Sequence, residues 1–322
     1  MSTTRRARWH ASSQITSFRF TRILFSLSAR VLILTLAAMI AFASNSLLCR
    51  AALKQTSIDA ASFTFVRVFS GAVVLWLVTN LRRMIRTTRD VGVGGNWISA
   101  LALFLYAAGF SFAYVDVAAG TGALLLFGAV QATMILWGLH KGERLRAIQI
   151  VGLVVAMTGL VVLLFPGLSA PPLFGSILML GAGVAWGIYS LRGKRERNPV
   201  TATTGNFVRA VPFAAAVSII FLRWLDLDIA GVIYAIISGA ITSGLGYVIW
   251  YCVLPSLKAA SAATVQLSVP VLAATGGILL LGEPITLRYV LASIAVLGGI
   301  ALVVVAPHSQ DQTASPTGQS RS

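Results

Sequence analysis

The sequence predicts an all-α integral membrane protein, with ten transmembrane helices as two inverted five-helix repeats and both termini cytoplasmic. Three observations predict this fold: the apolar composition, the alternation of basic and non-basic loops, and an internal repeat. Of the 322 residues, 57% are hydrophobic and only 11% are charged, and the mean hydropathy is +0.86. A soluble domain has about 45–50% apolar and about 25% charged residues, so a globular domain with one buried core is excluded.

Ten apolar segments are long enough to cross a bilayer, because a span needs about 20 residues at a rise of about 1.5 Å each. In the first half of the chain, we place them at 31–49, 60–79, 97–115, 119–139 and 147–165. In the second half, we place them at 173–191, 204–222, 230–252, 259–281 and 287–306. The five-plus-five division predicts one repeat over residues 31–166 and another over 167–306.

Basic residues alternate between the two sides of the predicted bundle. Of the 25 lysines and arginines, four lie in odd-numbered loops (Arg50, Lys54, Arg223, Arg288), two lie within spans (Arg67, Arg209), and the other 19 lie on the opposite side. Lysine and arginine concentrate in cytoplasmic loops, so the sequence predicts cytoplasmic termini and an inner (plasma) membrane location. The net charge of +16 is divided among short clusters between spans, and we expect no nucleic-acid partner.

The two ends of the chain differ from the spans in composition. Residues 1–30 are rich in Arg, Ser and Thr and contain no acid. We interpret them as a disordered basic cytoplasmic arm held near anionic lipid, although a transit peptide has a partly similar composition. Residues 307–322 are polar, which predicts a disordered cytoplasmic tail.

The internal repeat relates the two halves. The segment AGTGALLLFGAVQATMILWGLHKGERL at 119–145 aligns with AASAATVQLSVPVLAATGGILLLGEPI at 259–285, at an offset of 140 residues. The triplet FVR occurs at 65–67 and again at 207–209. Because each half has an odd number of spans, the second half would enter the bilayer from the opposite side, which is the pattern of secondary transporters.

Several stretches resemble one family of transporters. They are LHKGERLRAIQIVGLVVAMTGLVVL (Leu139–Leu163), GAGVAWGIYSLRGKR (Gly181–Arg195) and LLLGEPITLRYVLASIAVLGGIALVV (Leu279–Val304). Their order and spacing resemble the EamA-type transporters of the drug/metabolite transporter superfamily. The resemblance implies export of amino acids or drugs, while more distant relatives exchange sugar phosphates or nucleotide sugars. Family members often carry a proline midway through span four, whereas this chain has Val130–Gln131 there and keeps the second-half counterpart, Pro270.

Two arginines lie inside predicted spans, where a charge costs about 2.5–3.5 kcal/mol on insertion scales and needs a partner. We hypothesise that Arg67 pairs with Glu283 and that Arg209 pairs with Glu143, with one pair near each mouth of the bundle. The pairs would act as structural clamps or as alternating gates. Two alternatives stay open: each arginine caps backbone carbonyls, or it binds the substrate directly.

A small molecule that pauses at the midplane needs polar or aromatic contacts there. The spans offer seven such candidates for substrate binding: Tyr106, Gln131, Trp186, Tyr189, Tyr247, Trp250 and Gln266. Aromatic and hydroxyl groups in membrane helices also serve packing alone, so this prediction competes with a purely structural interpretation.

The sequence contains no nucleotide-binding loop of the G-x-x-x-x-G-K-[ST] type and no metal-binding motif, and we expect neither enzyme activity nor a cofactor. No carboxylate lies deep in a span, which favours facilitated or exchange-driven transport over a buried proton relay. The preferred hypothesis is a secondary transporter that exports amino acids or related amphipathic compounds, drugs among them. The alternative is an exchanger of phosphorylated or carboxylated anions that uses Arg67 and Arg209.

Overall fold

The computed structural model describes residues 3–86, 94–142, 145–167, 170–193, 196, 198–257 and 265–305, with side chains described within residues 29–304. All regular structure in these residues is helical. The first half contains α1 (Thr3–Gln55), α2 (Ala60–Arg86), α3 (Trp97–Ala113), α4 (Ala119–His140) and α5 (Ala147–Leu164). The second half contains α6 (Leu173–Gly193), α7 (Pro199–Ile220), α8 (Ile229–Ile237), η2 (Ser238–Leu245), α9 (Gly246–Val253), α11 (Ser268–Leu281) and α12 (Leu287–Val305). Two short 3₁₀ turns, η1 (Leu222–Trp224) and η3 (Leu254–Ser256), follow α7 and α9.

The helices agree with the ten predicted segments. α8, η2 and α9 form one continuous rod, because the backbone stays right-handed helical at Ile237 and at Gly246. The described residues therefore contain ten helical rods, of which eight are long and apolar enough to cross a membrane and two, α3 and α11, are shorter. The chain is a multi-pass membrane protein.

Two helices begin earlier than predicted. The backbone of α1 is helical from Thr3, so the expectation of a disordered arm over residues 1–30 is wrong where the structure describes it; neither Gly nor Pro interrupts the chain between Thr3 and Gln55. α7 begins at Pro199 rather than at residue 204, because the Asn198 side chain caps the Thr201 N–H and proline is well suited to the first turn.

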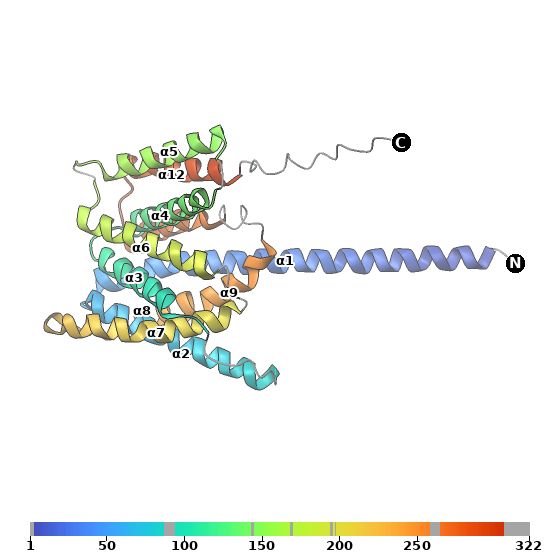
Figure 1. Ribbon diagram of the computed structural model, residues 1–322, viewed down its shortest axis with the longest axis horizontal. Coiled ribbons are helices and arrows are strands. Elements are labelled where there is room, and N and C mark those ends of the chain that lie inside the picture. The colour runs from blue at the N-terminus through green and yellow to red at the C-terminus, as the bar shows by residue number, and fades with distance from the viewer. Residues whose placement is uncertain are drawn as a thin grey trace, which may run out of the picture.

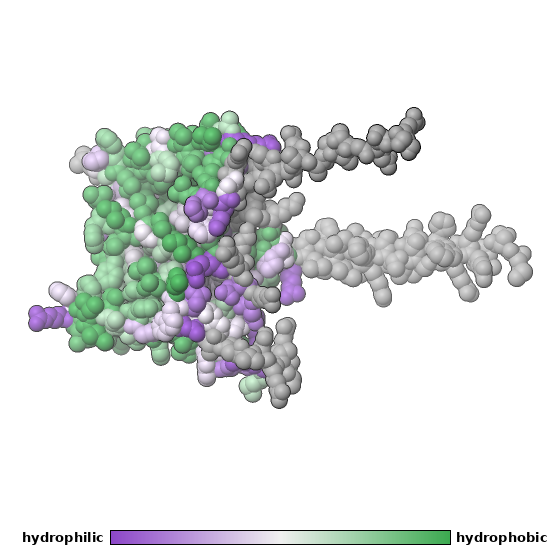
Figure 2. Space-filling model, viewed as in Figure 1, coloured by the Kyte–Doolittle hydropathy of each residue, from purple (hydrophilic) through white to green (hydrophobic). Residues whose placement is uncertain are grey.

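Figure 1 shows how the rods are arranged, with α5 and α12 at one edge, α2 and α7 at the other, and α1 running through the middle. α3 and α4 both pack against α6, while α1 packs against α8, α9 and α11. α1 begins at the same end of the bundle at which α12 finishes. Apolar side chains dominate the flank seen in Figure 2, as expected of a surface that faces lipid.

A π-helix, η2, interrupts the eighth rod where it packs against α2. Such segments are rare and often occur at functional sites. Gly239 allows the close approach, because a Cβ there would collide with the backbone oxygen of Arg67 and with Ser70 Oγ. The backbone of α2 at Arg67 is therefore held directly against η2.

Candidate functional site

Arg67 lies in the middle of the bundle and is only 2% exposed. Its Nη2 donates to the Tyr106 hydroxyl at 2.9 Å, and its Nε donates to Ser243 Oγ at 3.3 Å. The guanidinium also lies over the rings of Tyr106 and Phe110, 5.3 and 4.7 Å from their centroids. The remaining nitrogen, Nη1, is buried and has no hydrogen-bond partner.

Asn45 on α1 connects this arginine site to η2. Its Nδ2 donates to the Tyr106 hydroxyl at 3.2 Å. Its Oδ1 accepts from the hydroxyls of Ser238, Thr242 and Ser243 at 2.7, 3.2 and 3.4 Å. The amide thus joins α1, α3 and η2 in one buried network.

A small cavity lined by buried residues lies beside this network. The space open to the centre of a water molecule is about 20 Å³, which is room for about one water. Its lining comes from both halves of the chain: Phe42, Asn45, Ser46, Tyr106, Phe110, Leu126, Phe127, Trp186 and Tyr247. The Trp186 ring lies at the centre of an aromatic group, 4.8 Å from Tyr106, 4.9 Å from Tyr247 and 6.4 Å from Phe42.

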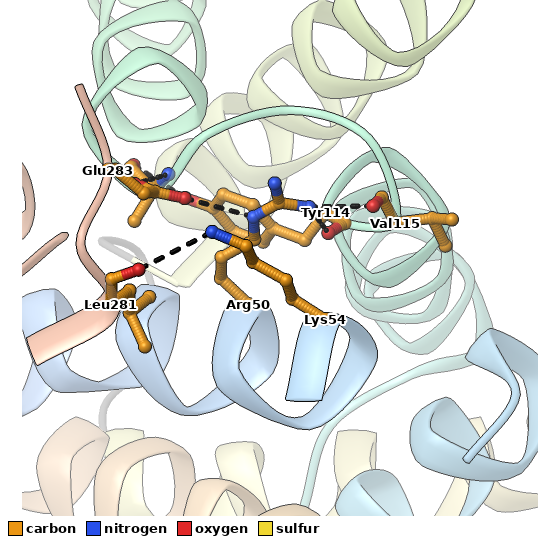
Figure 3. Close-up of polar contacts among 7 residues, drawn as sticks. Arg50, Lys54, Tyr114, Val115, Leu281 and Glu283 are labelled. Carbon is orange, nitrogen blue, oxygen red and sulfur yellow. Dashed lines mark hydrogen bonds and ion pairs between the residues drawn. The ribbon is translucent and has the colours of Figure 1, made fainter. Parts of the chain in front are cut away.

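One end of the bundle, which we call the Arg50 end, is closed by an ion pair (Figure 3). Arg50 Nε lies 3.0 Å from Glu283 Oε1, and the two side chains are 11% and 6% exposed. Arg50 Nη1 also donates to the carbonyls of Tyr114 and Val115 at 2.9 and 2.6 Å. The second carboxylate oxygen, Oε2, accepts from the backbone N–H of Ala119 at 2.8 Å. This clamp of five residues ties α1 to the α3–α4 and α11–α12 connections.

The opposite end, which we call the Arg192 end, is joined by polar contacts of a different kind. Arg192 Nε donates to Ser99 Oγ at 2.9 Å, and Arg192 Nη2 donates to Asn96 Oδ1 at 3.1 Å. The N–H of Asn96 in turn donates to Asn206 Oδ1 at 2.9 Å. A cavity of about 420 Å³ opens beside these contacts, lined by Asn96, Trp137, Ile188, Leu191, Arg192 and Glu196.

The predicted pairing of Arg67 with Glu283 is wrong, because Arg50 occupies the carboxylate instead. Arg67 lies deeper along its helix and contacts hydroxyls and rings. Arg209 is half-buried, and its Nη1 donates to the carbonyls of Gly94 and Gly205 at 2.7 and 3.1 Å, as the carbonyl-capping alternative expects. Its proposed partner, Glu143, lies outside the described residues.

Three of the seven predicted substrate contacts, Tyr106, Trp186 and Tyr247, meet in the lining of the central cavity. Two more lie next to lining residues: the Tyr189 ring is 5.4 Å from Trp186, and the Trp250 ring is 6.0 Å from Phe42. The two glutamines lie elsewhere. Gln131 is buried on α4 and Gln266 is half-buried before α11, and neither lines the cavity.

Asn45, Phe110 and Arg50 were missed by the sequence analysis. Phe110 gave no signal beyond that of any apolar residue in a span. Asn45 carried one, because an amide in the middle of an apolar span requires partners. Arg50 was counted only as a loop charge, although it lies five residues before the end of α1 and reaches back over the bundle.

Sequence comparisons relate this chain to a transporter family and to several bacterial and archaeal proteins. The EamA-like transporter family model matches residues 173–305. The uncharacterized protein PA1977 of Pseudomonas aeruginosa is 56% identical over 85% of this chain and 94% of its own length. An uncharacterized transporter of Archaeoglobus fulgidus is 32% identical over 59% of this chain and 69% of its own.

More distant matches were also found. The threonine/homoserine exporter RhtA of Escherichia coli K12 is 33% identical over 47% of this chain and 53% of its own length. A solved crystal structure superposes over 85% of this chain and 97% of its own, with a TM-score of 0.59 and 16% identity, which shows a shared fold. The family model and the transporter of Archaeoglobus fulgidus show that the protein is a transporter and not an enzyme. This chain belongs to the EamA-like transporter family of the drug/metabolite transporter superfamily.

Proposed function

We propose that the protein is a secondary transporter that exports amino acids or related amphipathic compounds, drugs included, across the inner membrane by alternating access. The observation that carries this proposal is a small aromatic and polar cavity, lined by buried residues, between two ends that separate polar contacts tie together. With room for about one water, the cavity admits a metabolite only when the surrounding helices move apart. A carrier that opens to one side at a time requires that behaviour.

The packing of the helices supports two inverted repeats, 31–166 and 167–306. If α1 to α5 correspond to α6, α7, the α8–α9 rod, α11 and α12, the most extensive contacts have counterparts. The contact of α3 with α6 then matches that of the α8–α9 rod with α1, and the contact of α4 with α6 matches that of α11 with α1. The pairs α2–α7, α4–α11 and α5–α12 each match themselves. Such a pattern is expected from a two-fold axis in the membrane plane.

The charge distribution supports an orientation with both termini in the cytoplasm. Arg82, Arg83, Arg86, Lys141 and Arg146 lie near the Arg192 end, where α2 and α4 finish and α5 begins. We assign that end to the cytoplasm by the concentration of basic residues. The Arg50 end then faces outward, and the basic residues of the first 30 positions lie on the cytoplasmic side, where the inner leaflet carries anionic lipid.

The substrate class rests on the cavity and on one relative. RhtA is named as an exporter of threonine and homoserine, which are small and amphipathic. The central cavity of this chain also combines polar groups with aromatic walls. The two-arginine anion exchanger is less well supported, because Arg209 is bound to two backbone carbonyls.

The proposal is tested by counterflow in proteoliposomes preloaded with threonine, leucine or phenylalanine. We expect saturable uptake of the labelled amino acid that matches the internal one. Trp186→Ala, which opens the aromatic group, should abolish uptake, whereas Trp76→Ala, the same change at a side chain 51% exposed on α2, should retain it. Uptake equal to that of protein-free liposomes for every amino acid, from correctly folded protein, would refute the proposal.

A further inference from the structure

Arg67 is a buried cation without a carboxylate. Among the described residues, the one ion pair within 4.0 Å joins Arg50 to Glu283, and Arg67 has only neutral partners. A charge inside the membrane region is expensive unless an opposite charge or several dipoles compensate it. Its Nη1 atom lacks even a neutral partner.

The hydroxyls beside Arg67 also have protons to donate. A tyrosine oxygen accepts two hydrogen bonds and donates one. The Tyr106 oxygen already accepts from Arg67 Nη2 and from Asn45 Nδ2, so its own proton must point elsewhere. The Tyr247 hydroxyl is buried, belongs to a lining residue of the same cavity as Tyr106, and has no hydrogen-bond partner among the described residues. Whichever way the hydroxyl protons of Tyr106 and Tyr247 are oriented, at least one of these two hydroxyls can donate a hydrogen bond to a ligand.

We propose that Arg67, together with Tyr106 and Tyr247, binds the carboxylate of the transported compound. The apolar part of that compound would lie against the lining residues Phe42, Phe110 and Trp186. This inference rests on the proposed transport function and deepens it. The group recognised is an anion, because the groups without a hydrogen-bond partner here, Arg67 Nη1 and a tyrosine O–H, are donors.

The other charged groups of a metabolite fit this site less well. The lining contains no Asp or Glu, so an ammonium would meet no opposite charge there. Asn45 Oδ1, an acceptor in the lining, is already engaged by three hydroxyls. Arg67 lies behind the lining residues Tyr106 and Phe110, and the lining itself contains no lysine or arginine. A dianionic phosphate would require a second cation beside Arg67. A monocarboxylate matches the single guanidinium.

The site is also held in place before a ligand arrives. Gly239 fixes the backbone of Arg67 against η2, and Ser243, one turn further along η2, accepts from its Nε. The rings of Tyr106 and Phe110 flank the guanidinium. Preorganised donors favour affinity because little order remains to be imposed on binding.

The first test uses the unmodified protein and pairs of ligands that differ in one group. Threonine, leucine and phenylalanine are compared with their amides, which keep the ammonium and the side chain but lack the negative charge. We expect at least one acid to exchange in counterflow and to raise the melting temperature of the purified protein, with its amide at least about 10-fold weaker. Equal competition by acid and amide would overturn the carboxylate proposal while leaving transport intact. Exchange of neither would overturn both.

The second test changes the arginine. Arg67→Gln should raise KM for the exchanged acid about 10- to 100-fold, and Arg67→Lys should recover part of that loss because the charge is kept. Arg288→Gln, at an arginine that donates to the carbonyl of Phe165, is the matched control and should leave KM unchanged. An unchanged KM in a folded Arg67→Gln protein would contradict the inference. If that variant does not fold, the acid–amide comparison still decides.

Discussion

Removal of Glu283 should open the Arg50 end. Glu283→Ala deletes the ion pair at 3.0 Å and the 2.8 Å bond from the Ala119 N–H, both in a nearly buried setting. Hydrogen bonds to charged groups contribute about 1.5–3 kcal/mol each, with partial compensation by water at this end. A net loss of about 2–3 kcal/mol from the closed state raises the open population about 30- to 150-fold, since each 1.4 kcal/mol is a factor of ten.

The chain contains its own reporter for this opening. Cys49 directly precedes Arg50, is fully buried, and lies within electrostatic reach of Arg67, between the clamp and the central cavity. In a Cys252→Ala background, the rate of labelling by a water-soluble maleimide measures how often the Arg50 end opens. We expect Glu283→Ala to increase that rate by about the factor derived above.

Two controls make the labelling experiment decisive. Arg288→Ala removes a half-buried arginine that donates to the carbonyl of Phe165, and it should change the rate less than twofold. Arg50→Ala should act like Glu283→Ala, and the double variant should fall short of the product of the two single effects because the residues share one bond. If Cys49 in the folded Glu283→Ala protein reacts no faster than in its parent, the clamp does not hold this end closed.

Three further predictions concern packing and the buried charge. Gly239→Ala should lower the melting temperature and abolish exchange, because the added Cβ would collide with α2. Gly298 has open space around it, so Gly298→Ala should keep the stability or raise it by up to about 1 kcal/mol. Thermal unfolding in detergent compares the two variants. Arg67→Met should abolish exchange without reducing the stability of the ligand-free protein, because it removes a buried charge that has no carboxylate partner in the part of the chain that the structure describes. A clear drop in melting temperature would favour the structural-clamp interpretation of Arg67. Gln149 Nε2 donates to the Val303 carbonyl at 2.9 Å, where α5 contacts α12. Gln149→Ala should lower the free energy of unfolding by about 1–3 kcal/mol and leave KM unchanged in the folded protein. A changed KM would show that this contact influences the cavity.

The positions of the helices along the chain could be predicted because they depend on local properties. The apolar length of each segment located the ten rods to within a few residues, apart from the starts of α1 and α7 and the end of α2. The predicted start of the ninth span, residue 259, lies outside the described residues. Pro199 illustrates the limit: its value as a helix start depends on the Asn198 cap, which an apolar-length criterion ignores.

The lateral arrangement of the helices could not be predicted in the same way. The depth of a residue in its span says nothing about which neighbour it faces. Arg67 and Glu283 were paired by depth alone, but the left-handed turn at Gly282 places the carboxylate beside Ala119 and Arg50. Tyr106, Trp186 and Tyr247 were chosen as polar or aromatic groups within spans, and the fold brings these three together.

The continuity of α1 between Asn45 and Arg50 links the cavity to the clamp. These residues are five positions apart on one unbroken helix, about 7.5 Å along its axis. A ligand that shifts Asn45 therefore changes the free energy of the ion pair at Arg50, and by thermodynamic reciprocity the clamp changes the affinity for the ligand by the same factor. Ligand binding in the cavity and closure of the Arg50 end then form a single coupled equilibrium. The factor by which a bound ligand slows or speeds Cys49 labelling should equal the factor by which opening of the Arg50 end changes the affinity for that ligand.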